Sequence, residues 1–257
     1  MTRTLLSWNV NGLRALHKRG GFVDWLLREQ PDALCLQEIK AFPEQLDPDL
    51  REIAGYRAYF NSGKLKGYSG VALYTREEPL DVAFGLGVPE FDAEGRLVQA
   101  DYGAFVLFGV YFPNGRMGSE RLDFKMRFYD AFLDRIESLR AEGRRIVVCG
   151  DVNTAHTAID LARPGPNSKV SGFLPHERAW IDRWLAAGYV DTFRLFSGEP
   201  GHYTWWANWA NSRARNIGWR IDYFVVSDDL APCVERSWIL SDVYGSDHCP
   251  IGLELNV

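Results

Sequence analysis

The amino-acid sequence predicts a protein of the α/β class, in which mixed β-sheets are covered by helices. Short apolar runs rich in β-branched and aromatic residues recur along the whole chain, which is typical of buried strands. Helical periodicity appears between some of these runs, and no linker rich in proline, glycine or serine divides the chain. A chain of 257 residues can bury one large core, so we expect one domain over residues 1–257.

Nine runs have the composition and length of strands. Each holds four to eight residues, and several are continuous apolar stretches of the kind that a sheet covered on both faces contains. In chain order they are Leu5–Val10, Ala33–Leu36, Gly70–Tyr74, Leu97–Ala100, Phe105–Phe112, Arg145–Gly150, Ile221–Ser227, Ser237–Leu240 and Ile251–Leu255.

Three segments have the pattern of helices. The longest is Ser119–Glu142, where apolar residues recur every three or four positions, with a serine placed to cap its start and Gly143 to end it. The two shorter helices are Phe22–Arg28, which ends before Pro31, and Pro175–Ala187, which Gly188 closes.

Two polar stretches, Ala162–Gly172 and Ala207–Gly218, are expected as surface loops.

The composition is that of a soluble globular protein, with 46% hydrophobic and 25% charged residues. No apolar run approaches the roughly 20 residues that cross a bilayer, and the N-terminus has no secretory signal. We therefore expect no membrane partner and a cytoplasmic location, at the nucleoid if the source is prokaryotic. The four cysteines form no C-x-x-C pair, so a zinc site is not expected.

The charge distribution is more informative than the net charge of −5, which taken alone argues mildly against a nucleic-acid partner. Between Gly201 and Arg220 there is no acidic residue, but there are three arginines and four of the nine tryptophans. A local basic excess on a solvated surface is common. Tryptophans interleaved with arginines favour a nucleic-acid binding partner, because aromatic rings stack on bases or wedge between them.

Polar residues at strand ends carry the chemical signal. Asn9 and Asn11 end the first strand and, by strand alternation, are expected to face the same way. Glu38 ends the second strand, and the crossover between the two places both carboxyl ends at one rim, where ligands bind in open α/β sheets. Taken alone, Glu38 is as readily a solvated carboxylate as a cation ligand.

Two further segments repeat this arrangement. Asp151 and Asn153 follow a strongly apolar strand, although an Asx-capped turn would give the same pattern. Asp247 and His248 precede the last strand. Asp222 lies inside an apolar strand, where a carboxylate requires a partner, and His248 is the candidate.

Carboxylates, amides and one histidine at strand ends suit a metal-dependent phosphoesterase. A hard divalent cation takes oxygen ligands, a carboxylate or histidine can deprotonate water, and amides can stabilise a more highly charged phosphate. The phosphate-binding G-x-x-x-x-G-K-[ST], the nucleophile elbow G-x-S-x-G and the zinc motif H-E-x-x-H do not occur. NTPase, α/β-hydrolase and zinc-protease functions therefore have no support.

Seven motifs in order give the chain a specific resemblance. Spread over nearly its whole length, they resemble motifs of the exonuclease III family of AP endonucleases, which belongs to the endonuclease/exonuclease/phosphatase superfamily. This resemblance implies a four-layer sandwich of two packed mixed β-sheets flanked by helices. The motifs are Ser7–Ala15, Leu36–Lys40, Lys66–Val71, Tyr111–Asn114, Gly150–Asn153, Gly218–Phe224 and Gly245–Pro250.

The resemblance also implies a role for each matching residue. Glu38 would be the principal ligand of Mg²⁺, or of Mn²⁺ in its place, with Asn11 and Asp247 close to the cation. Some family members have an aspartate in place of Asn11, so this metal site is less anionic than theirs. Asp151 would activate the attacking water. Residues expected at the scissile phosphate are Asn9, Tyr111, Asn153 and His248, the last oriented by Asp222.

The same match implies a DNA substrate. Trp205, Trp219 and Ile221 correspond to the pocket for a flipped-out abasic sugar, which sterically rejects an intact nucleotide. The implied activity is hydrolysis of the phosphodiester 5′ to an abasic site in duplex DNA, with 3′→5′ exonuclease or 3′-phosphodiesterase activity at blocked 3′ ends, by a monomer. Residues matching further DNA-contact positions are Arg14, Tyr68 and Asn167.

Two other function classes are weighed against this one. A phosphodiesterase or phosphatase for lipid or sugar phosphates would not need the DNA-contact motifs, and a non-catalytic DNA-binding module would not need every catalytic-type position filled.

The sequence leaves two alternatives for the role of Trp209. It lies in a polar loop without apolar periodicity, where it either packs against Trp206 or enters the DNA duplex as a wedge.

Overall fold

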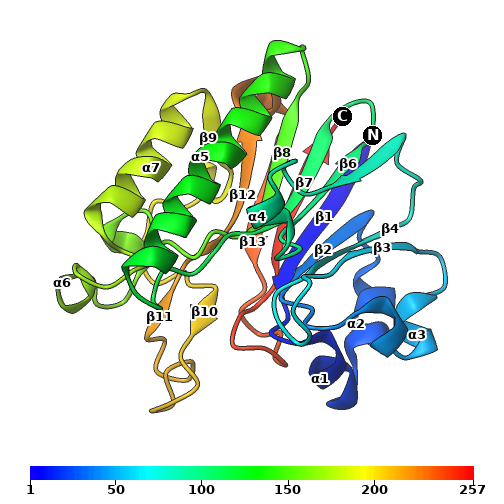
Figure 1. The fold of residues 1–257 in the computed structure, drawn as a ribbon, viewed down its shortest axis with the longest axis horizontal. Coiled ribbons are helices and arrows are strands. Elements are labelled where there is room, and N and C mark those ends of the chain that lie inside the picture. The colour runs from blue at the N-terminus through cyan, green and yellow to red at the C-terminus, as the bar shows by residue number, and fades with distance from the viewer.

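The computed structural model describes all 257 residues, and two six-stranded β-sheets form its centre (Figure 1). The first sheet has the spatial order β13 (Val234–Ile239), β14 (Ile251–Asn256), β1 (Thr2–Asn9), β2 (Ala33–Gln37), β4 (Val71–Thr75) and β3 (Arg57–Asn61). The second has the order β5 (Asp81–Phe84), β6 (Leu97–Asp101), β7 (Val106–Tyr111), β8 (Ile146–Asp151), β12 (Asp222–Ser227) and β9 (Tyr189–Asp191).

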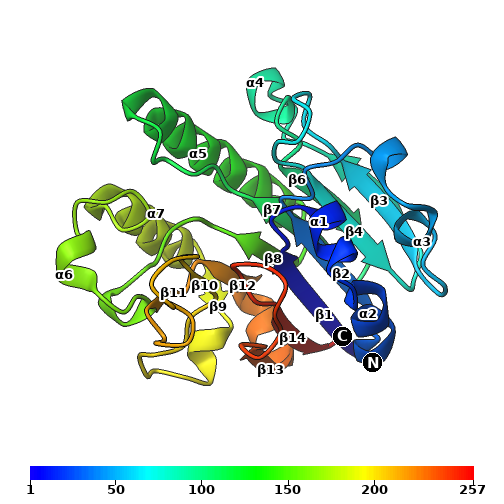
Figure 2. The same cartoon turned by 90° about the horizontal axis from the view of Figure 1, so that it is seen from below.

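Helices cover the outer faces of both sheets, so the expected four-layer sandwich is confirmed. Against the second sheet lie α5 (Ser119–Ala141) and α7 (Pro175–Ala186), and against the first lie α1 (Leu13–Lys18), α2 (Phe22–Glu29) and α3 (Pro48–Arg51) (Figures 1 and 2). The short elements are α4 (Pro89–Asp92), α6 (Pro164–Asn167), the hairpin β10 (Trp205–Trp206) and β11 (Gly218–Trp219), and 3-10 turns at Pro43–Gln45, Ala158–Asp160, Phe193–Leu195 and Asp228–Cys233.

Three apolar layers hold the sandwich together. Leu107, Phe224 and Leu253 belong to the layer between the two sheets, where alternating strand residues from both sides meet. Phe132 under α5 belongs to one outer layer and Trp25 on α2 to the other. Burying this apolar surface contributes roughly 25 cal/mol per Å² and provides the rigid frame for the strand ends.

Each sheet contains one parallel pair, at its middle. In the first, β1 runs parallel to β2 and Asn9 lies opposite Gln37; in the second, β7 runs parallel to β8 and Tyr111 lies opposite Asp151. The remaining pairs in both sheets are antiparallel. Asn9 and Asp151 are in hydrogen-bond contact, so the carboxyl ends of both parallel pairs meet at one end of the sandwich.

All nine expected strands are present, but some smaller expectations are wrong. Ser119 does not cap α5, because Gly118 holds the cap position and no side chain bonds the free N–H groups there. The polar stretch 162–172 contains the helical turn α6. The sequence also did not predict β3, β5 and β9: β3 and β5 are edge strands without a fully buried face, and β9 is only three residues long. No helix is long and apolar enough to cross a membrane.

Candidate active site

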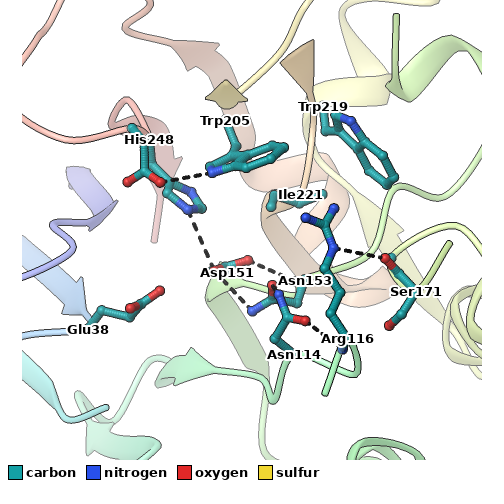
Figure 3. Close-up of a pocket in the computed structure, with 12 residues that line it drawn as sticks. Glu38, Asn114, Arg116, Asp151, Asn153, Ser171, Trp205, Trp219, Ile221 and His248 are labelled. Carbon is teal, nitrogen blue, oxygen red and sulfur yellow. Dashed lines mark hydrogen bonds and ion pairs between the residues drawn. The ribbon is translucent and has the colours of Figure 1, made fainter. Parts of the chain in front are cut away.

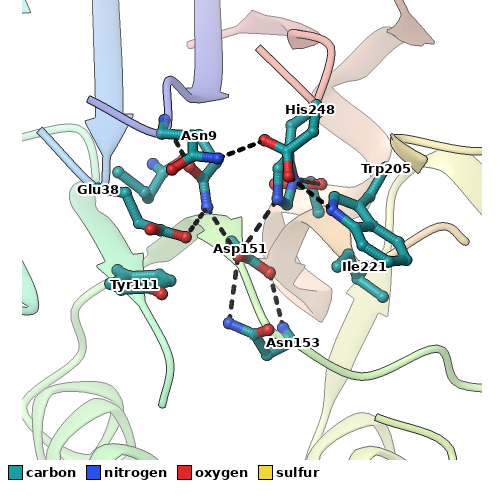
Figure 4. A network of polar contacts seen from close by, with 12 residues as sticks. Asn9, Glu38, Tyr111, Asp151, Asn153, Trp205, Ile221 and His248 are labelled. Atoms are coloured by element: carbon teal, nitrogen blue, oxygen red, sulfur yellow. Dashed lines mark hydrogen bonds and ion pairs between the residues drawn. The ribbon is translucent and has the colours of Figure 1, made fainter. Parts of the chain in front are cut away.

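Asn9 joins the two sheets at the end where the parallel strands finish (Figure 4). Its side-chain amide donates to Glu38 Oε1 and to Asp151 Oδ2, both at 2.9 Å, and the residue is fully buried. The predicted convergence of Asn9 and Glu38 is therefore confirmed, and it extends across the sandwich to β8. One amide thus fixes two carboxylates that approach from different sheets.

Glu38 lies just beyond β2 in a strained backbone conformation, with φ of 52°. The Gly12 N–H donates to the Glu38 carbonyl at 2.7 Å and holds this turn in place. Burial alone would raise the pKa of Glu38, but the Lys40 ammonium at 2.8 Å and the Asn9 amide outweigh it and lower that pKa. Glu38 is therefore ionised, with Lys40 as its counter-charge.

Asn11 does not follow the strand alternation assumed from the sequence, because β1 ends at Asn9 and Asn11 has φ of 45°. Its amide donates to Asp247 Oδ1 at 2.9 Å, and its oxygen accepts from Lys40. The Trp205 indole N–H donates to Asp247 Oδ2 at 3.0 Å. Burial would raise the pKa of Asp247, but His248 and these hydrogen bonds lower it, so a second carboxylate is ionised here.

Asp151 ends β8 and is buried beneath the other polar groups. The turn requires glycine before it, because a Cβ on Gly150 would lie 1.9 Å from the Val110 carbonyl oxygen. The backbone N–H of Asn153 donates to Asp151 Oδ1 at 2.8 Å. Burial, followed by repulsion from Asp222, raises the pKa of Asp151 to about 7. This carboxyl can therefore exchange a proton near neutral pH.

His248 and Asp222 form a buried pair, as the isolated carboxylate in the apolar strand predicted. His248 Nδ1 lies 2.8 Å from Asp222 Oδ2, and the Thr204 hydroxyl donates to the same oxygen at 2.6 Å. Burial would lower the pKa of His248, but Asp222 and Asp151 outweigh it and raise that pKa to about 10. The ring is an imidazolium at neutral pH, and its Nε2 lies 3.9 Å from Asp151 Oδ2.

These groups can hold a divalent cation. Glu38 and Asp151 each bring a carboxylate oxygen within 4.8 Å of the other, and carboxylate oxygens are hard donors of the type that Mg²⁺ or Mn²⁺ takes; His248 lies in the same cluster, but as an imidazolium it has no free lone pair to bind a cation. Burial is the main cause of the raised pKa of Asp151, and repulsion from the Asp222 and Glu38 carboxylates adds to it. A bound cation would reduce that repulsion, so the residues fit a metal.

A pocket of about 200 Å³ opens beside this cluster (Figure 3). Its apolar wall is formed by Trp205, Trp219 and Ile221, the three residues for which the family resemblance implies a role in a sugar pocket. The two indole rings lie 6.3 Å apart at 82° and form a corner. The other lining residues are polar and include Glu38, Asn114, Arg116, Asp151, Asn153, Ser171, Asp247 and His248.

Tyr111 completes the cluster from the second sheet. It ends β7 opposite Asp151 and is 8% exposed. Burial raises the pKa of Tyr111, and the Glu38 carboxylate raises it further, so its hydroxyl keeps a proton to donate. The structure thus brings every predicted catalytic and metal-binding residue to one end of the sandwich.

The remaining predicted DNA contacts lie around this end, in separate surroundings. Arg14 is exposed and lines a groove of about 430 Å³ together with Lys18 and Lys40. The Tyr68 hydroxyl accepts from Arg121 at 2.9 Å and is half-buried. Asn167 does not line the pocket; its amide donates to the carbonyl of Arg163 at 2.7 Å, within the turn of α6.

Trp209 is exposed, at 69%, on the loop that joins β10 to β11. It makes no ring contact with Trp206, which instead packs under the Arg213 guanidinium at 4.6 Å and donates to Asn216 Oδ1 at 3.1 Å. The exposure of Trp209 therefore gives no support to the alternative in which it packs against Trp206. Arg213 also donates to the carbonyls of residues 241, 243 and 246, so the loop is anchored while its indole points outward.

Sequence reasoning missed a buried ion pair behind the site. Lys125 on α5 and Glu177 on α7 are both fully buried, with Nζ to Oε1 at 2.7 Å. Lys125 also donates to the Asn153 carbonyl at 2.8 Å, while Glu177 accepts from Gly172 N–H at 2.6 Å. The pair therefore ties the Asp151–Asn153 turn to the pocket rim. A lysine within the apolar stripe of a helix is the signal that could have revealed it.

Comparison with known proteins places the chain among nucleases. The Endonuclease/Exonuclease/phosphatase family matches residues 6–248. The exodeoxyribonuclease of Bacillus subtilis is 44% identical over 98% of this chain and 99% of its own, and the DNA repair nuclease APEX1 of Danio rerio is 42% identical over 98% and 82%. An AP endonuclease from Archaeoglobus fulgidus superposes with a TM-score of 0.89 at 27% identity, covering 99% of this chain and 100% of that one.

The family match, the full-length relatives and the four-layer fold agree with the polar cluster at the strand ends. Enzymes of this family are divalent-metal-dependent, and the acidic cluster here is a possible metal-binding site. The chain therefore belongs to the endonuclease/exonuclease/phosphatase family, as a nuclease of its exonuclease III-type AP endonuclease branch.

Proposed function

We propose that this protein hydrolyses the phosphodiester 5′ to an abasic site in duplex DNA, leaving a 3′-hydroxyl and a 5′-deoxyribose phosphate. The observation that carries the proposal is the small pocket with two indoles and Ile221 as its wall, which opens directly on the buried cluster of acids and imidazolium. A sugar without a base suits such a wall, and a missing base lowers the free energy needed to flip the nucleotide out.

The chain's own residues supply the proton transfers and the charge stabilisation. Asp151, with its pKa raised to about 7, accepts the proton of the attacking water. The His248 imidazolium, held by Asp222, stabilises the additional negative charge on the phosphate oxygens. The hydroxyl of Tyr111 donates to the same phosphate, and Asn9 and Asn153, whose amides hold Asp151 in the free protein, would turn an N–H group to the phosphate once it is bound.

Glu38 anchors the cation in this proposal, with Asn11 and Asp247 close to it. When bound, Mg²⁺, or Mn²⁺ in its place, neutralises phosphate charge and so lowers the barrier to attack. The Lys40 ammonium compensates Glu38 when no cation is present, because it contacts both Glu38 and Asn11. We retain Arg14, Tyr68 and Asn167 as proposed DNA contacts. Arg14 lines a groove beside Lys18 and Lys40, whereas Tyr68 and Asn167 lie outside the catalytic pocket.

A second activity at 3′ ends accompanies the first in our proposal. A relative at 44% identity is named exodeoxyribonuclease, and a Neisseria protein described as a 3′ phosphatase superposes with a TM-score of 0.90. The same pocket and acids would act on a 3′-terminal sugar or on a blocked 3′ end. The protein would act as a monomer in the cytoplasmic compartment that holds the DNA.

One assay tests the proposed function. A duplex with a single tetrahydrofuran abasic analogue and a 5′ label is incubated with the protein in Mg²⁺ or in EDTA, beside a matched duplex without the analogue. Cleavage directly 5′ to the analogue, in Mg²⁺ alone, is expected. Binding without cleavage would indicate a DNA-binding module, and hydrolysis of lipid or sugar phosphates but not of DNA would indicate the other phosphoesterase class.

The rate of cleavage is expected to rise as the pH passes about 7 and to fall as it approaches 10. Asp151 accepts a proton only when ionised, above its pKa of about 7, and His248 is cationic only below its pKa of about 10. Asp222→Asn removes the charge that stabilises the imidazolium, so the alkaline limb should move to lower pH. Single-turnover cleavage rates measured from about pH 6 to about pH 10 in both proteins test this pH dependence. An unchanged alkaline limb in Asp222→Asn would contradict the assignment of that limb to His248.

Trp209→Ala is expected to weaken binding of an abasic duplex by roughly 5- to 100-fold, because stacking of a base on an aromatic ring contributes about 1–3 kcal/mol. The indole projects from an anchored loop and can fill the gap that the extruded sugar leaves. Fluorescence anisotropy with Trp209→Phe and the exposed control Phe196→Ala gives the comparison. Wild-type affinity in the alanine variant, or a large fall in its melting temperature, would exclude the wedge.

A further inference from the structure

Arg116 brings a guanidinium to the rim of the pocket without an anionic partner. It lies on the segment between β7 and α5, and its Cζ is 5.5 Å from the Trp205 ring and 5.6 Å from the Trp219 ring. Its Nε donates to the Ser171 carbonyl at 3.5 Å. No carboxylate forms an ion pair with it, and its two terminal nitrogens, which carry four of its five N–H groups, have no hydrogen-bond partner.

This placement favours an anionic ligand. Burial lowers the pKa of Arg116, and the Glu177 carboxylate, which is ion-paired with Lys125, offsets this only in part, so the charge of Arg116 is not fully compensated. A guanidinium is planar and presents paired donors that match a phosphate. The pocket lining holds no other arginine and no lysine, so an anion reaching this end of the pocket would meet Arg116.

The position of Arg116 is fixed relative to the catalytic cluster. Its backbone N–H donates to Asn114 Oδ1 at 2.9 Å, and the Asn114 amide donates to Asn153 Oδ1 at 3.0 Å. Figure 3 shows the guanidinium across the pocket from Glu38, with Asp151 and Asn153 between the two ends. The indoles of the apolar wall therefore have the catalytic cluster, through His248 beside Trp205, on one side and Arg116 on the other.

A sugar within a DNA strand carries a phosphate on each side, whereas a 3′-terminal sugar with a free hydroxyl carries only the 5′ one. We propose that Arg116 binds the phosphate on the 3′ side of the pocket-bound sugar and so favours cleavage at internal abasic sites over cleavage at strand ends. This inference rests on the proposed function, cleavage 5′ to that sugar. Arg116 is then a specificity-determining residue: it contacts the part of the substrate that distinguishes endonuclease from exonuclease action.

Two substrates that differ in this phosphate test the proposal. One is a duplex with an internal tetrahydrofuran residue; the other is a nicked duplex in which the same residue is 3′-terminal with a free hydroxyl. Arg116→Ala should lower kcat/KM on the internal site by about 10- to 100-fold, the loss expected when charge-assisted hydrogen bonds are removed, and change the terminal site by less than about threefold. Arg116→Lys, which keeps the charge but not the planar donors, should fall between.

A third duplex replaces the phosphate 3′ to the internal analogue with an uncharged methylphosphonate. It should slow the wild-type protein about as much as Arg116→Ala does, and should add little to the loss in that variant, because both changes remove one interaction. Arg183→Ala, which removes an exposed arginine on α7, is the matched control. Melting temperatures verify that each variant folds.

Equal losses on the internal and terminal substrates would mean that Arg116 only shapes the pocket wall, and would overturn the proposal. So would full activity of Arg116→Ala on the internal site, or additive losses with the methylphosphonate. Wild-type protein that cuts neither duplex would instead overturn the proposed function, and this inference with it. The outcomes are therefore distinguishable.

Discussion

Asp151→Asn is expected to lower the rate of abasic-site cleavage by about 10²- to 10⁴-fold and to leave the affinity for abasic DNA within a few-fold, the range that loss of a general base produces. The substitution keeps the shape of the side chain and an acceptor for the Asn153 N–H, but it removes the only carboxyl in the site whose raised pKa of about 7 suits it to take a proton near neutrality. Single-turnover cleavage and anisotropy measure the two quantities.

Stability provides the control for this variant. Because the pKa of Asp151 is raised on folding, the folded state holds this proton more tightly than the unfolded chain, and ionisation destabilises the fold as pH rises through about 7. Asparagine removes that effect but loses an acceptor for Asn9. The two changes oppose each other, so the melting temperature at pH 8 should stay within a few degrees of wild type. A large loss of stability and of DNA affinity together would mean that Asp151 is structural.

Glu38→Ala is expected to reduce cleavage by about 10³-fold or more at limiting Mg²⁺, the effect of losing several kcal/mol of metal-derived charge stabilisation. Glu38 is the carboxylate that β2 brings to the cluster, and its pKa is lowered, so it is ready to bind a cation. Alanine has the same Cβ at φ of 52°, so the backbone strain is unchanged. Calorimetric titration with Mg²⁺ should show weakened binding in step with the rate.

Glu90→Ala, at an exposed surface ion pair on α4, is the matched control for Glu38→Ala and should retain activity and Mg²⁺ binding. Excess Mg²⁺ should restore part of the rate of Glu38→Ala, since the neighbouring oxygens of Asn11 and Asp247 are still present. A near-normal rate at limiting Mg²⁺ would remove Glu38 from the metal site.

Local patterns were sufficient to predict the centre of the site. The parallel arrangement of β1 and β2 follows from a strand, a short helix and a strand, and it is enough to place Glu38 beside Asn9. Asp222 inside an apolar strand required a partner, and His248 is that partner. In both cases the prediction depended on one or two elements whose geometry is nearly invariant.

Features that depend on several elements at once were not predictable. The bridge from Asn9 to Asp151 requires the two sheets to pack in one register, and no periodicity within either sheet specifies it. Arg116 reaches the pocket because Asn114 is held by Asn153 and because Ser171 approaches from another loop. Edge strands such as β5 lack a fully buried face, so the hydrophobic signal that marks inner strands is weak there.

The bridge made by Asn9 has a consequence for partly unfolded states of this protein. Glu38 comes from one sheet and Asp151 from the other, so the reacting groups exist as a set only while the sheets are docked. In an expanded state formed in mild denaturant at pH 8, each sheet and its helices can keep their backbone hydrogen bonds while side-chain packing between layers loosens. Catalysis would then disappear while far-ultraviolet circular dichroism hardly changes. The cleavage rate would therefore detect loss of tertiary packing in this protein more sensitively than the circular dichroism signal does.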